Sequence, residues 1–144
     1  MTIEDKQQEI IQHFSFFTEW MDKYEEIIRM GRELPPLDTS HHTDEKLIKG
    51  CQSKVWLNAE MKDGKLIFEA DSDAIITKGL VAMMVSVLSD HTPEDIIKSE
   101  LYFIEEIGLT HHLSPTRSNG LLAMVKQMKN YAIAFQTLSK IGKI

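Results

Sequence analysis

The 144-residue sequence lacks several features that mark specialised protein classes. A single cysteine excludes an internal disulfide, and a free thiol is typical of a reducing, cytoplasmic compartment. No apolar run approaches the roughly 18 residues that a membrane-spanning helix needs. The first residues, MTIEDKQQEI, are acidic and amide-rich, unlike a secretory leader. We therefore expect a cytoplasmic protein that is not anchored in a membrane.

Basic residues are also in the minority. Lysine and arginine number 16 against 22 acidic residues, which gives a net charge of -6. Proteins that bind nucleic acids present basic faces, so this balance argues against nucleic-acid binding as the main role. The length is that of one domain, and 42% hydrophobic residues are enough for a core. We expect a single domain over residues 1–144.

The common motifs of metal, nucleotide and hydrolase sites are missing. The adjacent pairs His41–His42 and His111–His112 do not form the HxxxH, HExxH or CxxC spacing of zinc sites. No GxxxxGK[ST] or GxGxxG loop could hold phosphate, and no GxSxG elbow singles out a serine nucleophile. One cysteine cannot hold an iron–sulfur cluster within a monomer. We therefore predict no resident metal.

The clearest structural pattern lies in VWLNAEMKDGKLIFEAD, residues 55–71. Asp63-Gly64 favours a two-residue hairpin turn. Centring the turn there places the apolar side chains on one face, in the pairs Met61–Leu66, Ala59–Phe68 and Leu57–Ala70. The other face carries Trp56, Asn58, Glu60, Ile67 and Glu69. Since an isolated hairpin is marginally stable, we expect a third strand from the residues before Cys51.

Helical periodicity dominates the rest of the chain. We expect helical structure over residues 3–31, ending at Gly31, and leave open whether a break near 17–20 divides it into two helices. A further helix should begin after a cap at Asp71 or Ser72. Thr92-Pro93 predicts a helix start that runs to about Ile107. Residues 111–120 read as a loop that leads to a last helix. The order indicates an α+β fold, with helices covering one face of a small antiparallel sheet.

The lone cysteine lies in IKGCQSKVW, residues 48–56. One interpretation is a small buried hydrophobe. However, Gly50 allows a tight turn and leaves space beside the sulfur. Lys46, Lys49 and Lys54 are near in sequence, and cations favour the nucleophilic thiolate. The cysteine also falls at a loop-to-strand junction, where functional groups are often presented. Cys51 is therefore the candidate nucleophile.

Four segments in this order resemble the SufE/CsdE family of sulfur-acceptor proteins. They are KYEEIIRMGRELPPL (23–37), IKGCQSKVW (48–56), DSDAIITKGL (71–80) and LTHHLSPTRSNGL (109–121), and together the resemblance covers nearly the whole chain. It implies a SufE/IscU-like α+β fold. It also implies that Cys51 takes sulfane sulfur, as a persulfide, from a cysteine desulfurase of the SufS/CsdA type. The chain would stimulate that enzyme and deliver sulfur to a scaffold for iron–sulfur cluster assembly.

The resemblance also implies which residues and molecules assist. Gly50 and Gln52 flank the cysteine, and Asp73, His112 and Arg117 fall inside matching segments as supporting or partner-contacting residues. Pyridoxal phosphate would belong to the desulfurase, so no cofactor is expected in this chain. The desulfurase, the sulfur recipient, homodimer formation and the status of the chain as an enzyme are left open. A peroxide-reactive redox sensor and a non-catalytic activator of a desulfurase are the competing interpretations of the lone thiol.

Overall fold

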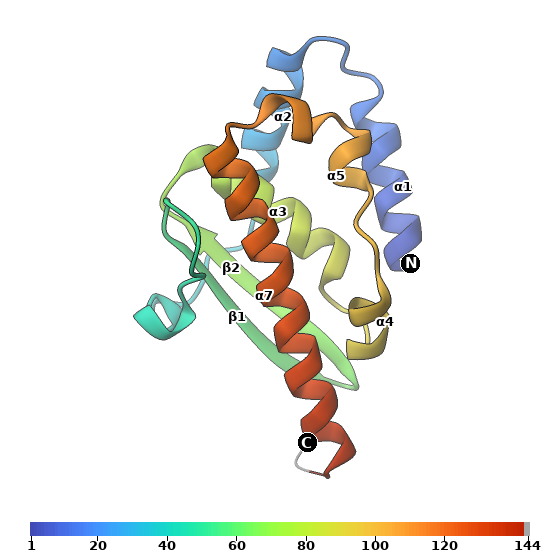
Figure 1. Ribbon diagram of the computed structural model, residues 1–144, viewed down its shortest axis with the longest axis vertical. Coiled ribbons are helices and arrows are strands. Elements are labelled where there is room, and N and C mark those ends of the chain that lie inside the picture. Colours follow the sequence, from blue (N-terminus) through green and yellow to red (C-terminus); the bar gives the residue numbers. More distant parts are fainter. Residues whose placement is uncertain (143–144) are drawn as a thin grey trace.

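The computed structural model describes residues 1–142, and it shows helices packed around one antiparallel hairpin (Figure 1). This confirms the predicted α+β class. The elements in chain order are α1 (Ile3–Phe14), α2 (Trp20–Arg32), the 3-10 turns η1 (Thr39–His41) and η2 (Asp44–Lys46), β1 (Val55–Lys62), β2 (Lys65–Ser72), α3 (Ile75–Leu88), α4 (Pro93–Lys98), α5 (Phe103–Glu106), α6 (Leu109–His112) and α7 (Pro115–Lys140). None of the helices in this described part is long and apolar enough to cross a membrane.

The hairpin has the predicted register. Leu57 pairs with Ala70, Ala59 with Phe68, and Met61 with Leu66. Both turn residues adopt positive φ, 53° at Asp63 and 80° at Gly64, as a type I′ turn requires. The predicted third strand is wrong. Within residues 1–142 the sheet has two strands, and the segment before Cys51 adds only an isolated bridge between Leu47 and Trp56. The 3-10 turn η2 directly precedes Leu47 and prevents a longer extended segment.

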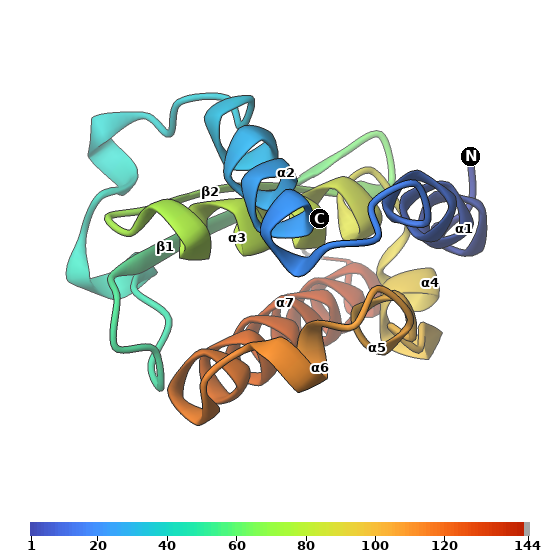
Figure 2. The same ribbon diagram turned by 90° about the horizontal axis from the view of Figure 1, so that it is seen from above.

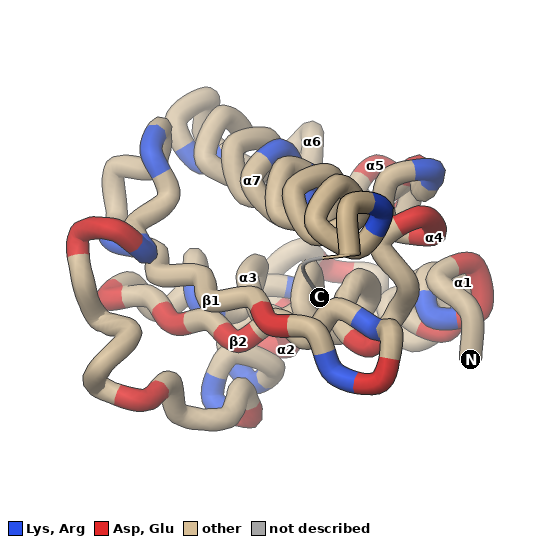
Figure 3. Tube along the Cα trace, turned by 90° about the horizontal axis from the view of Figure 1, so that it is seen from below, with Lys and Arg blue, Asp and Glu red and all other residues tan. Residues whose placement is uncertain are grey.

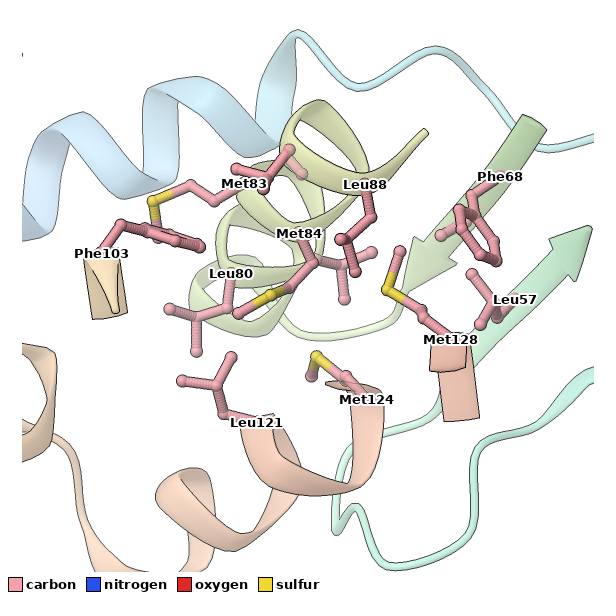
Figure 4. Packing of buried hydrophobic residues seen from close by; sticks show 14 of the residues in the cluster. Leu57, Phe68, Leu80, Met83, Met84, Leu88, Phe103, Leu121, Met124 and Met128 are labelled. Atoms are coloured by element: carbon pink, nitrogen blue, oxygen red, sulfur yellow. The ribbon is translucent and has the colours of Figure 1, made fainter. Parts of the chain in front are cut away.

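Helix α3 lies at the centre of the molecule and is buried on most of its circumference. Ten of its 14 residues are buried, and it packs against α1, α2, α7 and β2. Figure 4 shows Met84 of α3 facing Met124 and Met128 of α7, with the hairpin side chains Leu57 and Phe68 on the other side of Met128, while Met83 lies beside Phe103. Flexible thioethers fill the irregular space between helices that cross a twisted sheet. This core fixes the relation of α7 to the hairpin.

The N-terminal helical segment is two helices, because residues 15–19 are not helical and separate α1 from α2. The break therefore exists and overlaps the predicted region, although it begins two residues earlier. The predicted stop at Gly31 is wrong by one residue, since α2 ends at Arg32. Gly31 instead packs on Gly79 of α3, where an added Cβ would lie 2.7 Å from the backbone nitrogen of Gly79. Tertiary contact, and not helix termination, accounts for this glycine.

The predicted continuous helix from Thr92 to Ile107 is also wrong, because residues 99–102 separate α4 from α5. The reason is Gln7 of α1, which is buried. Its side-chain amide donates to the carbonyl of Glu100 (3.0 Å) and accepts from the backbone N–H of Phe103 (3.2 Å). These bonds satisfy backbone groups that a continuous helix would have satisfied itself. Gly108, with φ of 86°, marks the end of α5 as expected.

Two further helix starts differ from prediction. Helix α3 begins at Ile75 and its N-cap is Ala74, so neither Asp71 nor Ser72 caps it. Both residues belong to β2, and the Ser72 hydroxyl accepts from the Ala74 N–H at 3.3 Å. The loop predicted over 111–120 is largely helical, since α6 ends at His112 and α7 begins at Pro115. Ser114 caps α7, so the local signal for a start was present and the predicted loop was too long.

Candidate functional site

Cys51 lies on a short loop between η2 and β1, residues 49–54, which we call the Cys51 loop. Its base is closed by three backbone-anchored hydrogen bonds. The Ile48 N–H donates to the Val55 carbonyl (2.9 Å), the Asp73 N–H to the Lys54 carbonyl (3.1 Å), and the Lys54 N–H to Asp73 Oδ1 (3.0 Å). The closure ties the loop to the end of β2, and Cys51 lies within the loop with its side chain half-buried.

Gly50 allows the loop to turn just before the cysteine. Its φ of 95° lies in the region that L-residues avoid. A Cβ at this position would also come within 3.3 Å of the Ala123 Cβ on α7. The tight turn therefore places the loop against α7, and Figure 2 shows the loop reaching the first turns of that helix.

The start of α7 forms the facing wall of the site. Ser114 accepts the Arg117 N–H on its hydroxyl oxygen (3.3 Å), and Pro115 occupies the first helical position. This cap fixes Arg117 in the first turn, at the positive end of the helix dipole. One turn further on, Gly120 is buried against Cys51. The local sequence thus places a cation and a residue without a side chain on the part of α7 that lines the pocket at the thiol.

The thiol opens into a pocket of about 270 Å³ between the Cys51 loop, α3 and α7. The inner lining comes from Leu80 of α3 and Met124 of α7, both almost fully buried. The other lining residues, which are mainly polar, are Gln52, Ser53, Thr77, Ser114, Thr116, Arg117 and Gly120. A nucleophile beside an apolar recess with a polar rim can carry a small group and shelter it.

Burial raises the pKa of the Cys51 thiol above its ordinary value. The Sγ–H donates to the Gly120 carbonyl at 3.6 Å, a contact that also suits the neutral thiol. Desolvation is the cause, and the neighbouring lysines do not reverse it, so the expectation that they favour thiolate is wrong for this arrangement. Lys49 and Lys54 are exposed to water, which screens their charges.

The structure brings most of the candidate site residues together. Cys51, Gln52 and Arg117 line the one pocket, Gly50 shapes the loop, and Asp73 ties its base. His112 is placed elsewhere and does not line the pocket. Its ring stacks on Trp20 of α2, with centroids 4.2 Å apart and planes inclined by 10°. Its position accounts for packing between α6 and α2.

Sequence reasoning missed the parts of the pocket that come from helix interiors. Gly120 and Thr116 fall in the loop predicted over 111–120, and neither Thr77 nor Met124 is singled out by a motif. One signal was available for Gly120: a glycine that interrupts a helical pattern often marks a close packing contact. The remaining residues carry no such signal, since their spacing only indicates burial.

A larger pocket, about 650 Å³, lies between the start of α1, α4 and the hairpin tip. Its charged lining residues include Lys65, His91 and Lys98 as well as Glu4 and Asp95. Both signs are mixed, and every fully buried polar side-chain atom of the described chain has a partner. Among these same residues no three histidine, cysteine or acidic side chains gather as a metal site would. The pocket at Cys51 therefore remains the site that holds a reactive group.

Comparison with known proteins identifies the family to which this chain is similar. The family model of SufE, described as an Fe–S metabolism associated domain, matches residues 8–132. An uncharacterized SufE-like protein of Synechocystis sp. is 35% identical over 134 residues, which is 93% of this chain and 84% of that protein. SufE-like protein 1, chloroplastic/mitochondrial, of Arabidopsis thaliana is 40% identical over 129 residues, 89% of this chain but only 35% of that longer protein.

A solved structure shows the same fold at low sequence identity. The solution structure of a hypothetical protein from Thermus thermophilus superposes with a TM-score of 0.76 at 17% identity, covering 92% of this chain and 96% of the other. The family match spans both the Cys51 loop and the start of α7. The chain therefore belongs to the SufE family, whose domain is associated with iron–sulfur metabolism.

Proposed function

We propose that this chain accepts sulfane sulfur on Cys51 from a pyridoxal-phosphate-dependent cysteine desulfurase and stimulates that enzyme. It then delivers the sulfur to iron–sulfur cluster assembly. The observation that carries the proposal is the placement of the chain's single thiol on the Cys51 loop, half-buried beside a pocket with room for additional atoms. Membership of the SufE family supports the link to iron–sulfur metabolism. The predicted cytoplasmic location stays a prediction.

The transfer step follows the logic of thiol–disulfide exchange. The Cys51 thiolate attacks the outer sulfur of the donor enzyme's cysteine persulfide. The S–S bond of the donor breaks, and the donor cysteine leaves as a thiolate with the electron pair. Cys51 then carries the outer sulfur and its proton as a persulfide. No oxidant is needed, because the sulfane sulfur moves between two cysteines at the same oxidation level.

The pocket and the reaction place opposite demands on the thiol. In the pocket, burial favours the neutral thiol, which is a poor nucleophile. We propose that partner binding moves the Cys51 loop out of the pocket, so that water or the partner can stabilise the thiolate. The hydrogen bonds between Lys54 and Asp73 would oppose this movement, so contact with the partner has to offset them. The same recess then shelters the persulfide after the loop returns.

Charge on α7 also suits a sulfur anion. Every one of the 22 acidic residues lies at or before Glu106, so α7 contains none, and Figure 3 shows its tube with basic segments only. Arg117, although exposed, lines the same pocket as Cys51. A wall that carries one cation and no carboxylate lowers the cost of holding a persulfide anion at this place. We propose that Arg117 contributes to this stabilisation and to contact with the donor enzyme.

A turnover assay tests the proposal against the activator alternative. Alanine release by a cysteine desulfurase is measured with free cysteine, with and without this chain, for the wild type and Cys51→Ser. We expect stimulation by the wild type and none by the serine variant, although serine replaces only one atom. Equal stimulation by both would contradict the acceptor role and favour a non-catalytic activator. Rapid oxidation of Cys51 by peroxide in the absence of a desulfurase would instead favour the redox-sensor alternative.

A further inference from the structure

Gly120 stands at the sixth position of the 26-residue helix α7, where glycine normally costs stability. Its backbone does not require glycine, because its φ is not among the positive ones in the described chain. The reason for the missing side chain must therefore lie in what Gly120 faces. It faces Cys51, and its carbonyl accepts the thiol proton.

The space at this contact is larger than the reduced thiol needs. A Cβ on Gly120 would lie 3.5 Å from Sγ, 3.9 Å from Cα and 4.0 Å from Cβ of Cys51, all ordinary van der Waals distances. Alanine would therefore fit against the free cysteine without displacing it. Glycine instead leaves a methyl-sized space directly beside the sulfur.

We infer that Gly120 is a positioning residue whose missing side chain leaves room for the outer sulfur of a Cys51 persulfide. The inference rests on the proposed function and specifies how its site holds the product. Gly120 shares the pocket with Leu80 and Met124, which are 1% and 2% exposed. An outer sulfur in this space is shielded from water and small thiols by helix α7 and the core. With alanine at 120, the same sulfur is displaced toward the polar rim at Gln52 and Arg117.

A purely structural role for Gly120 predicts a different result. Alanine has the highest helix propensity and glycine one of the lowest, so Gly120→Ala alone would raise the Tm and leave sulfur chemistry unchanged. Asn119→Ala is the matched control. Asn119 precedes Gly120 in the same turn, is exposed, and does not line the pocket, so its replacement improves helix propensity without altering the space beside Cys51.

The test loads the persulfide without any desulfurase. Wild type, Gly120→Ala and Asn119→Ala are incubated with inorganic polysulfide. The Cys51 thiolate attacks a sulfur atom of the polysulfide, an S–S bond breaks, and a shorter polysulfide leaves with the electron pair. Excess reagent is removed and glutathione is added. Its thiolate attacks the outer sulfur and Cys51 leaves as a thiolate, so the loss of one sulfur is followed by intact mass.

We expect the Gly120→Ala persulfide to be lost about fourfold faster, since moving one methylene-sized atom from a core into water changes its partitioning by that factor. Asn119→Ala should match the wild type, and the Tm of Gly120→Ala should not fall. Equal persulfide lifetimes in all three proteins would overturn the inference, as would unfolding of Gly120→Ala or no persulfide on the wild type. A desulfurase that transfers nothing, together with a fourfold difference after polysulfide, would contradict the proposed function and support this inference.

Discussion

Two glycine contacts in this molecule look alike in sequence and differ in purpose. Where α2 crosses α3, Gly31 and Gly79 bring backbone against backbone, and a Cβ on Gly31 would lie 2.7 Å from the Gly79 nitrogen. A Cβ on Gly79 would collide with the Ile27 carbonyl. Where α7 meets the Cys51 loop, a Cβ on Gly120 would find only ordinary contacts. The first contact is filled, and the second leaves space.

This difference in available space distinguishes glycines that the fold requires, Gly31 and Gly79, from a glycine that serves the site, Gly120. Close backbone packing at Gly31 and Gly79 fixes α2 on the central helix, and no side chain can be accommodated there. At Gly120 the fold would tolerate a side chain, so the space has to be explained by chemistry at Cys51. The distance to the nearest atom, and not the residue type, distinguishes the two cases.

Gly79→Ala should give the largest effect. The new methyl group would overlap the Ile27 carbonyl, and overpacking a helix crossing costs about 3 kcal/mol. Gly120→Ala should be neutral or stabilise by up to about 1 kcal/mol. Urea unfolding of both variants measures the contrast. Similar free energies of unfolding for the two variants would remove the distinction between a filled and an open glycine contact.

Gly50→Ala should have the next largest effect, through the backbone. A φ of 95° is unfavourable for alanine, and we expect a loss of roughly 1–2 kcal/mol or a change in the loop that relieves the strain. In the second case the thiol leaves its pocket, so alkylation of Cys51 by iodoacetamide should become faster. Unchanged stability together with unchanged alkylation would show that the left-handed turn does not hold the cysteine in place.

Asp73→Ala should loosen the base of the Cys51 loop with little loss of global stability. It removes the acceptor of the Lys54 N–H, a hydrogen bond worth about 1 kcal/mol, so the population of loop-out molecules should rise about fivefold. Iodoacetamide alkylation at constant pH measures this population. Asp73→Asn is the matched control, because its amide oxygen can still accept the bond. If the two variants alkylated at the same rate, the Asp73 side chain would not anchor the loop.

The smallest effect concerns pH. Burial raises the thiol pKa in the folded chain, so the folded state favours the neutral form. This contribution to stability is fully present below the pKa of the unfolded thiol and is lost as pH rises through the folded pKa. The midpoint of the alkylation rate against pH should therefore be higher in the folded chain than in urea. A lower midpoint in the folded chain would mean that cations, and not desolvation, dominate the site.

The hairpin register could be predicted because its determinants are local. Alternation of side chains and the Asp63-Gly64 turn fix the pairing without reference to the rest of the chain. The break between α4 and α5 could not, because Gln7, more than 90 residues earlier in the chain, supplies the hydrogen bonds that permit it. The prediction of a third strand was wrong for a similar reason, because strand pairing there depends on the path of the chain before Leu47.

The same division applies to the site. Cys51 and Arg117 were found from short motifs, and they line one pocket. His112 lies in an equally prominent motif and stacks on Trp20 instead, because a motif does not determine which way a helix face turns. Gly120 and the residues of the inner lining lie within helices. The periodicity of a helical sequence indicates which residues are buried, but not which residues they contact. The pKa of the thiol likewise depends on packing, because desolvation raises it despite the nearby lysines.

The most direct test of the central claim is the mass of the intact chain after reaction with a desulfurase. The chain is incubated with a cysteine desulfurase, pyridoxal phosphate and free cysteine without reductant, and Cys51→Ser is treated in parallel. We expect an added mass of about one sulfur atom on the wild type, removed by reductant and absent from the serine variant. No added mass on the wild type with a range of active desulfurases, or equal addition to Cys51→Ser, would contradict this expectation.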